Sequence, residues 1–176
     1  MAITKIQSES LNLADTYDFT GTVTGAGGVN TPAFHAYLSA NQNINSNVNT
    51  KVQCNTEIYD TDNCYDNSTN YRFTPTTAGK YYVYANLSGQ QEDYVIYYSM
   101  PMIYKNGSEI ARITNVLGNG AVYGHADFVS VVVDMNGSSD YVEFFGNIDI
   151  HVHGQEKFVG NSSLSITSFG AYRIIE

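Results

Sequence analysis

The sequence predicts an all-β fold, an antiparallel β-sandwich of eight to ten short strands, and three observations carry this prediction. Apolar and polar residues alternate along several short stretches, which is the period of a strand with one buried face. Turn residues such as Asn-Gly recur between these stretches. Tyr and Gly, fifteen residues each in a chain of 176, are abundant, whereas charged residues make up only 14%. This composition is typical of strands and turns, and no stretch has a sustained 3.6-residue helical period.

Residues 1–28 are predicted to form an extended N-terminal arm. Their apolar residues are sparse, and the segment ends in the hinge Gly25-Ala26-Gly27-Gly28. Such a segment cannot bury a core of its own, so it is either a disordered tail or an arm that a partner orders, and we expect an arm held by other chains.

Residues 29–176 are predicted to form a single head that contains all the strands. Asn-rich residues 41–51 are expected to be a loop, and Asn106-Gly107 and Asn136-Gly137 are expected turns. The predicted long strands are 32–38, 52–60, 81–88, 92–104, 109–115, 127–135, 141–150 and 163–175. Pro101 within one of them marks an edge or a bulge.

The strand at residues 81–88 has two distinct faces. Its first row is apolar and should face the core, namely Tyr81, Val83, Ala85 and Leu87. Its second row should face solvent or a neighbouring subunit, namely Tyr82, Tyr84, Asn86 and Ser88.

The stretch from Asp60 to Tyr81 resembles the central signature of the globular heads of complement component one-q, relatives of the tumour necrosis factor jelly rolls. Asp60 and Tyr65 have the signature's spacing, as do Phe73, Gly79 and Tyr81 among themselves, although seven residues rather than six separate Tyr65 from Phe73. Residues 32–38 and 169–172 are similar to the first and last strands of that family. The resemblance implies a jelly-roll strand order, where the sequence pattern alone also allows other β-sandwiches. It implies a signature core of Phe34, Ala36, Leu38, Asp60, Tyr65, Phe73, Gly79, Tyr81, Val83, Phe169 and Tyr172.

The charge balance argues against several classes of partner. The formal net charge is −9, and the eight Lys and Arg residues are scattered. Binding to nucleic acid or to an anionic membrane needs clustered cations, so we expect neither. No apolar run approaches the ~20 residues that span a bilayer. The first ten residues lack the apolar core of a signal peptide, so we expect synthesis in a cytoplasm without export.

Three groups of residues are candidate chemical sites. Cys54 and Cys64 are close enough in sequence for a disulfide across a hairpin, but we expect reduced thiols. The acidic loop around Asp60, Asp62 and Asp66 has oxygens for calcium, but we expect a turn capped by its own side chains. His151 and His153 would share one face of a strand and could meet a metal, but surface histidines are the expected reading. His35 and His125 have no evident partners in the sequence. No cofactor is expected.

Tyrosines form the most suggestive surface feature. They could stack against a sugar or fill a subunit interface, because Tyr combines a large apolar ring with a polar tip. The resemblance to one-q heads, which associate as trimers, favours the interface. The candidate residues are Tyr82, Tyr84, Tyr94, Tyr97, Tyr98, Tyr104 and Tyr123.

These observations lead to an expected function without catalysis. The sequence contains no Gly-any-Ser-any-Gly elbow, no phosphate-binding loop and no acid pair with a clear role. Segments of the arm resemble N-terminal attachment pieces of small structural proteins of tailed phages. We therefore expect a homotrimeric virion component, such as a short fibre, head decoration or tail appendage, that binds other virion proteins through residues 1–28. The alternative is an adhesin module that recognises a host surface glycan or protein.

Overall fold

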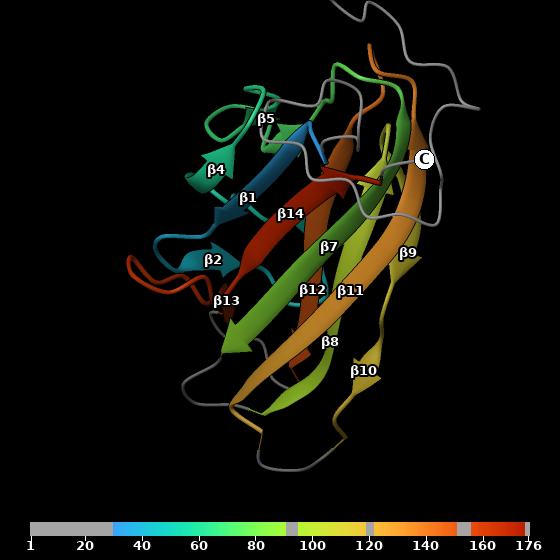
Figure 1. Cartoon of the computed structure of the whole chain (residues 1–176). Coiled ribbons are helices and arrows are strands. Elements are labelled where there is room, and N and C mark those ends of the chain that lie inside the picture. Colours follow the sequence, from blue (N-terminus) through green and yellow to red (C-terminus); the bar gives the residue numbers. More distant parts are fainter. Residues whose placement is uncertain (1–29, 91–94, 119–121, 151–155, 175–176) are drawn as a thin grey trace, which may run out of the picture.

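The computed structural model of the chain describes residues 30–90, 95–118, 122–150 and 156–174, so the predicted arm lies outside it. Two antiparallel sheets of seven strands each pack against one another (Figure 1). No α-helix occurs in these described ranges, and none of their segments is a helix long and apolar enough to span a bilayer. The predicted all-β jelly-roll class is confirmed.

The first sheet holds the strands that build the candidate site. Its order is β2-β13-β7-β14-β1-β4, and β11 also pairs with β7. Its strands are β1 (Ala33–Tyr37), β2 (Gln42–Ile44), β4 (Thr56–Asp60), β7 (Gly79–Gln90), β11 (Gly124–Met135), β13 (Glu156–Phe158) and β14 (Ser168–Arg173).

The second sheet covers the inner face of the first. Its order is β10-β8-β12-β6-β5, with β3 paired to β12 and β9 paired to β8. Its strands are β3 (Thr50–Lys51), β5 (Tyr65–Asp66), β6 (Arg72–Phe73), β8 (Ile96–Lys105), β9 (Ser108–Arg112), β10 (Asn115–Val116) and β12 (Val142–Ile150).

The strand count exceeds the predicted eight to ten because six of the fourteen strands have only two or three residues. Two of these, β2 and β3, lie within residues 41–51, which were predicted to be a loop. A predicted strand over 52–60 begins only at Thr56. Backbone groups of a polar segment can join a ladder whatever its side chains are, and two or three residues are too few to show an alternating pattern.

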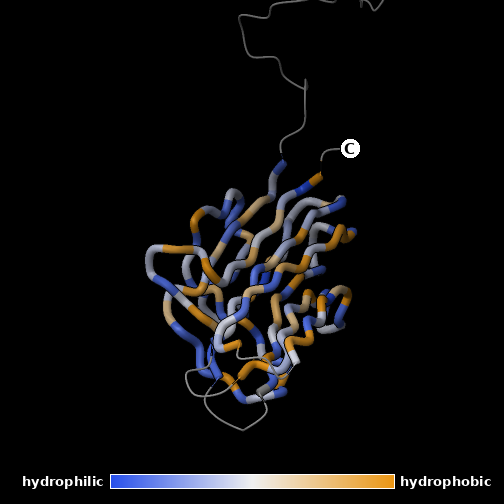
Figure 2. The backbone as a smooth tube through the Cα atoms, turned by 90° about the horizontal axis from the view of Figure 1, so that it is seen from below, coloured by the Kyte–Doolittle hydropathy of each residue, from blue (hydrophilic) through white to orange (hydrophobic). Residues whose placement is uncertain are grey.

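β7 shows the predicted alternation. Tyr81, Val83, Ala85 and Leu87 are fully buried, whereas the intervening residues are partly exposed on the other face. The mixture of hydrophilic and hydrophobic residues along neighbouring strands is visible in Figure 2. β7 therefore contributes one row to the core and one row to the outside of the first sheet.

An aromatic cluster fills the core between the two sheets. The ring of Phe34 stacks on Tyr65 at 4.5 Å and on Phe73 at 4.6 Å between centroids, and it meets Phe169 edge-on at 5.1 Å. Phe34, Phe73 and Phe169 are fully buried. These four aromatic residues belong to the predicted signature core, and they come together from four different strands.

Tyr172 does not belong to this core, contrary to the prediction. Its side chain is 36% exposed, whereas Phe169 and Ala171 are fully buried. Positions 169 and 172 differ by an odd number of residues, so they lie on opposite faces of β14.

The predicted turns at Asn106-Gly107 and Asn136-Gly137 are present. Asn106 and Gly107 both have positive φ, at 51° and 79°, as the two central residues of a type I′ hairpin require. Pro101 lies opposite the gap between β9 and β10, where its carbonyl accepts the Ile113 N–H at 3.2 Å. The proline thus marks an interruption of the pairing on one side of β8.

Candidate functional site

The outer side of the first sheet carries a continuous group of side chains that we call the aromatic face. The pairing register places these side chains in rows, because directly opposite residues of antiparallel strands point to the same side. One row joins Val132, Tyr82 and Tyr172, and the next joins Ser130, Tyr84, Gly170 and His35. The whole face comprises Ala33, His35, Tyr37, Tyr59, Tyr82, Tyr84, Asn86, Phe128, Ser130, Val132, Ser168, Gly170 and Tyr172.

Tyr84 lies at the centre of the aromatic face. A methyl group added at Gly170 would lie 2.4 Å from the Tyr84 ring, so the ring lies directly against this glycine. The Tyr84 hydroxyl is 2.9 Å from His35 Nδ1, and the two rings stack with centroids 5.8 Å apart. His35 also stacks on Tyr59 at 6.4 Å. The Tyr84 ring therefore lies over Gly170, and from this position it contacts His35.

Burial shifts the acid–base behaviour of this central pair. It lowers the pKa of His35 and raises that of the Tyr84 hydroxyl. A neutral His35 can accept a hydrogen bond from Tyr84 through Nδ1, provided that the ring proton is on Nε2. The centre of the aromatic face is thus uncharged near neutral pH.

The aromatic face lacks formal charges although the chain has a net charge of −9. None of its residues is Asp, Glu, Lys or Arg, and the same outward rows of β7 and β11 continue beyond Tyr82 and Val132 into the ion pair of Lys80 with Asp134, at 2.7 Å. Several of its largest apolar side chains are exposed, with fractions of 53% for Val132, 49% for Phe128, 42% for Tyr59 and 36% for Tyr172. An exposed patch that is aromatic and poor in charge has the composition of a protein interface core.

The predicted tyrosine surface is not one surface. Tyr82 and Tyr84 belong to the aromatic face, but Tyr97, Tyr98 and Tyr104 lie on β8 in the other sheet. Tyr104 packs on the ring of Phe145 at 4.4 Å and is partly buried there. Tyr123 precedes β11 and is 50% exposed, and Tyr94 lies outside the described residues. Alternation within a strand does not tell which sheet the strand joins, so the sequence could not divide these candidates between the two sheets.

Several members of the aromatic face were not predicted. The sequence assigned His35 no partner, yet it contacts Tyr59 and Tyr84. Phe128 and Val132 belong to the outward row of β11, opposite Asn86 and Tyr82. The alternation of β1 and β11 would have placed these side chains on the outer face, but the neighbouring strands are needed to bring them together.

The acidic loop uses several of its carboxylate oxygens to cap its own backbone, whereas Asp60 Oδ1 is buried without a hydrogen-bond partner among the described residues. The Asp66 carboxylate accepts hydrogen bonds from the N–H groups of Ser68, Thr69 and Asn70, at 3.1, 2.9 and 3.0 Å. These bonds, led by that from Thr69, lower the pKa of Asp66. Asp60 caps Tyr65 N–H at 2.8 Å. The loop is therefore an Asx-capped turn, the expected reading.

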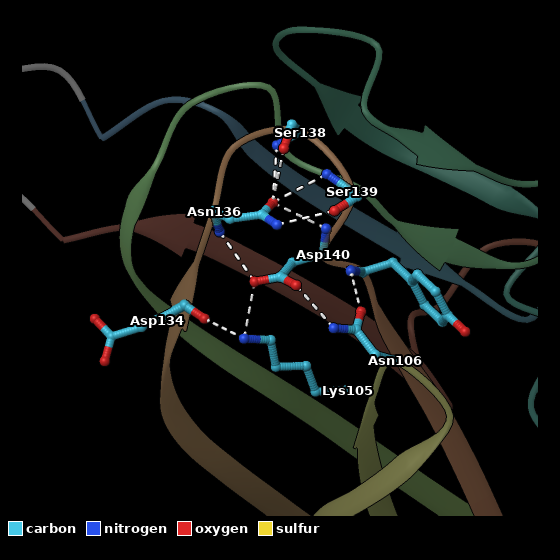
Figure 3. Close-up of polar contacts among 8 residues, drawn as sticks. Lys105, Asn106, Asp134, Asn136, Ser138, Ser139 and Asp140 are labelled. Carbon is cyan, nitrogen blue, oxygen red and sulfur yellow. Dashed lines mark hydrogen bonds and ion pairs between the residues drawn. The ribbon is translucent and has the colours of Figure 1, made fainter.

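A second polar cluster, at the turn between β11 and β12, is also structural (Figure 3). Asn136 Oδ1 accepts the backbone N–H groups of Ser138, Ser139 and Asp140 at 2.9–3.0 Å. Asp140 accepts hydrogen bonds from Asn106 Nδ2 at 2.7 Å and pairs with Lys105 Nζ at 2.9 Å. These contacts, first that of Lys105, lower the pKa of Asp140. Each polar group is engaged within the turn, which leaves none aimed at a ligand.

The remaining candidates that the structure describes are the two cysteines. Cys54 and Cys64 are buried free thiols. His151 and His153 lie outside the described residues. Within the described part of the chain, no group of three or more His, Cys, Asp or Glu side chains is placed to hold a metal ion.

Solved structures of known proteins share the fold of this chain. No family model matches the sequence, and no curated protein matches it. Many solved structures are similar to it, and three of them match over 81–83% of this chain. Murine APRIL matches with a TM-score of 0.56 and 11% identity over 98% of its own length, and the globular domain of the zebrafish complement 1qA protein with 0.54 and 12% over 99%. Eiger TNF from S. frugiperda matches with 0.52 and 7% over 92%. The chain thus has the jelly-roll fold of tumour necrosis factor and complement one-q globular domains.

Proposed function

We propose that the chain is a non-enzymatic, homotrimeric jelly-roll head whose subunits meet through the aromatic face. The observation that carries the proposal is the aromatic face, which is exposed and uncharged and is bordered by the ion pair of Lys80 with Asp134. Tyr and Phe rings bury large apolar areas on association, and Tyr hydroxyls can still reach hydrogen-bond partners. A second copy of the same chain is the occupant because a strongly acidic protein meets its own copies with least repulsion where both surfaces lack charge. Three is the number of copies that the resemblance to one-q heads implies.

The interface is tested by placing a charge on it. Val132→Glu puts a carboxylate on the aromatic face, where association would bury it without a partner. Ile110→Glu is the matched control, since Ile110 is 39% exposed on β9 in the other sheet. Sedimentation equilibrium should give a trimer for the wild type and the control, and a monomer for Val132→Glu. Equal masses for the two variants would overturn the interface.

We further propose that residues 1–28 attach the head to a tailed-phage particle as a fibre, decoration or appendage. Support comes from the resemblance of this segment to phage attachment pieces. Mass spectrometry of purified particles tests this role, and absence of the chain from them would overturn it. Sedimentation of a chain that begins at Val29 separates the two proposals. If the shortened chain remains trimeric, the head carries assembly and the arm is free to dock; a monomer would assign assembly to the arm.

A host-binding role is the second candidate. Tyr97 and Tyr123 are exposed, by 37% and 50%, where β8 and β11 begin, and these strands begin at the end of the sandwich opposite the start of β1 (Figure 1). Aromatic rings at a distal end are suited to stacking on sugar rings. An adhesin would bind host cells, and Tyr97→Ala with Tyr123→Ala should weaken that binding while leaving the trimer intact.

A further inference from the structure

Three polar side chains converge between the two sheets at one edge of the sandwich. Asn115 comes from β10 of the second sheet, whereas His125 and Asp127 come from the inward row of β11 in the first. The atoms Asn115 Nδ2, His125 Nε2 and Asp127 Oδ1 form a nearly equilateral triangle, with sides of 2.9, 3.0 and 3.0 Å. His125 and Asp127 can share this point because residues two apart in a strand face the same side.

Hydrogen bonds alone do not satisfy this triangle. If His125 Nε2 carries a proton and donates to Asp127, the Asn115 amide group meets another donor. If His125 Nε2 is unprotonated, it faces the Asp127 oxygen as a second acceptor. Turning the Asn115 amide so that its oxygen accepts from His125 brings that oxygen against Asp127 Oδ1. With the His125 ring in this orientation, one side of the triangle is therefore unfavourable for every arrangement of these neutral and anionic groups.

Two further polar atoms at this place lack partners. Asp127 is 92% buried, with an exposed fraction of 8%, and its Oδ2 has no hydrogen bond in the described part of the chain. Ser99 is fully buried, and its Oγ has no partner there either. Ser99 lies directly opposite Asn115 in the β8–β10 pair, so both side chains are on the same side of that sheet. An unpaired buried oxygen costs free energy that a ligand would recover.

We propose that Asn115, His125 and Asp127 bind a divalent transition-metal ion. With the Asn115 amide turned so that Oδ1 takes the place of Nδ2, the imidazole nitrogen, the carboxylate and the amide oxygen would each offer a lone pair to one cation, which removes the conflict between donors and acceptors. Three ligands on one face of an octahedron, each about 2.1 Å from the metal, are about 3.0 Å apart, whereas tetrahedral ligands are about 3.4 Å apart. The triangle therefore fits an octahedral ion such as Mn²⁺, Co²⁺ or Ni²⁺ better than tetrahedral Zn²⁺. A nitrogen ligand disfavours Ca²⁺, which takes oxygens.

The position of the site predicts what the metal does. β10 pairs with β8 in the second sheet and β11 pairs with β7 in the first, so the ion would crosslink the two sheets. The side chain of His125 is 24% exposed and that of Asp127 only 5%, so the ion can enter from the His125 side. Binding to the folded state alone raises stability as the metal concentration rises.

The experiment uses the full-length protein after removal of metals with a chelator. Ni²⁺, Mn²⁺ and Zn²⁺ are titrated separately in a calorimeter, and thermal unfolding is followed at each metal concentration. We expect one ion per chain, an unfolding temperature that rises with metal, and tighter binding of Ni²⁺ than of Zn²⁺. His125→Asn and Asp127→Asn should each weaken binding at least tenfold, since even partners of ligands contribute about that much. Absence of saturable binding at one ion per chain would show that the triangle is only a polar cluster, and would overturn the proposal.

Two controls locate the site. Asp134→Asn changes an exposed carboxylate of the same strand and should leave the affinity unchanged. The double variant His151→Asn with His153→Asn should also bind as the wild type does; loss of binding there, with retention in His125→Asn, would assign the metal elsewhere. If His125→Asn does not fold, Asn115→Asp and Asn115→Ala decide. The added carboxylate should tighten binding and the alanine should weaken it, whereas equal affinities would overturn the proposal.

Discussion

Replacing Gly170 by alanine perturbs the aromatic face without removing any aromatic ring. The new methyl group would lie 2.4 Å from the ring and hydroxyl of Tyr84, far closer than atoms can approach. Gly170 has an ordinary strand conformation, because its φ does not lie in the region that favours glycine. The backbone therefore tolerates alanine, and the Tyr84 ring must move outward.

The structure allows an estimate of the cost. Overpacking of a well-packed site costs about 1–3 kcal/mol. In a separate subunit the ring can swing into solvent, so the cost should fall near 1 kcal/mol, including the lost contact between Tyr84 and His35. In the proposed trimer the displaced ring would meet the neighbouring subunit. A loss of about 1 kcal/mol at each of three subunits weakens association by about two orders of magnitude.

Sedimentation equilibrium over a range of concentrations measures this effect. Gly124→Ala is the matched control, because it adds a methyl group to the same sheet where, among the described residues, the Gly89 carbonyl at 3.7 Å is the one close neighbour. On dilution, the Gly170→Ala trimer should dissociate at a concentration at which the wild type is still trimeric. The Gly124→Ala trimer should dissociate at the same concentration as the wild type. Identical association of both variants and the wild type would refute the assignment of the aromatic face as the interface. A fall in thermal stability without a change in association would show that the aromatic face stabilises the single subunit and is not the interface.

Three further predictions follow from the core and its titratable groups. Phe34→Ala should lower the free energy of unfolding by about 3–5 kcal/mol in urea titrations, because Phe34 is fully buried among aromatic rings. Leu164→Ala, at a side chain that is 60% exposed, should change it by less than about 0.5 kcal/mol; similar costs for both would contradict the packing argument. Cys54 and Cys64 should resist Ellman's reagent in the native protein and react in denaturant, and a disulfide-linked peptide in an unreduced digest would speak against free thiols. Because burial lowers the pKa of His35, the unfolded chain takes up the proton first, so stability should fall as the pH drops below about 6.5. The effect should stay below about 1 kcal/mol at this partly exposed site and be absent in His35→Gln; equal pH dependence of the two proteins would exclude His35 as its source.

The long strands could be predicted from sequence because each carries its own period of two. β7 is the clearest case, since its apolar and polar rows occupy the two faces that the alternation assigned. The short strands β2 and β3 could not be predicted, because the partner strand rather than the sequence of two or three residues makes them. Alternation also argued against Tyr172 as a core residue, since Phe169 on the same strand already faced inward.

The candidate site was harder to predict because it depends on which strands are neighbours. Tyr84 meets His35 across β14, at a separation of 49 residues in sequence. Asn115 meets His125 and Asp127 from the other sheet. Neither contact leaves a signal in a local pattern, whereas the topology produces both. Tyr98 and Tyr104 show the converse case. Their tyrosine-rich strand resembles the one that holds Tyr82 and Tyr84, yet it belongs to the other sheet.

β11 connects the two proposals and also makes them separable. Its outward row gives Phe128 and Val132 to the aromatic face, and its inward row gives His125 and Asp127 to the proposed metal site. Substitutions in one row leave the side chains of the other row in place, so Val132→Glu should abolish association and still bind one metal ion per chain. Asp127→Asn should lose the metal and still associate. If metal removal nevertheless weakened association, the bound ion would be needed to hold β11 in the position that the interface requires. Unchanged association without metal would show that the pairing of β11 with β7 over its full length is sufficient for that purpose.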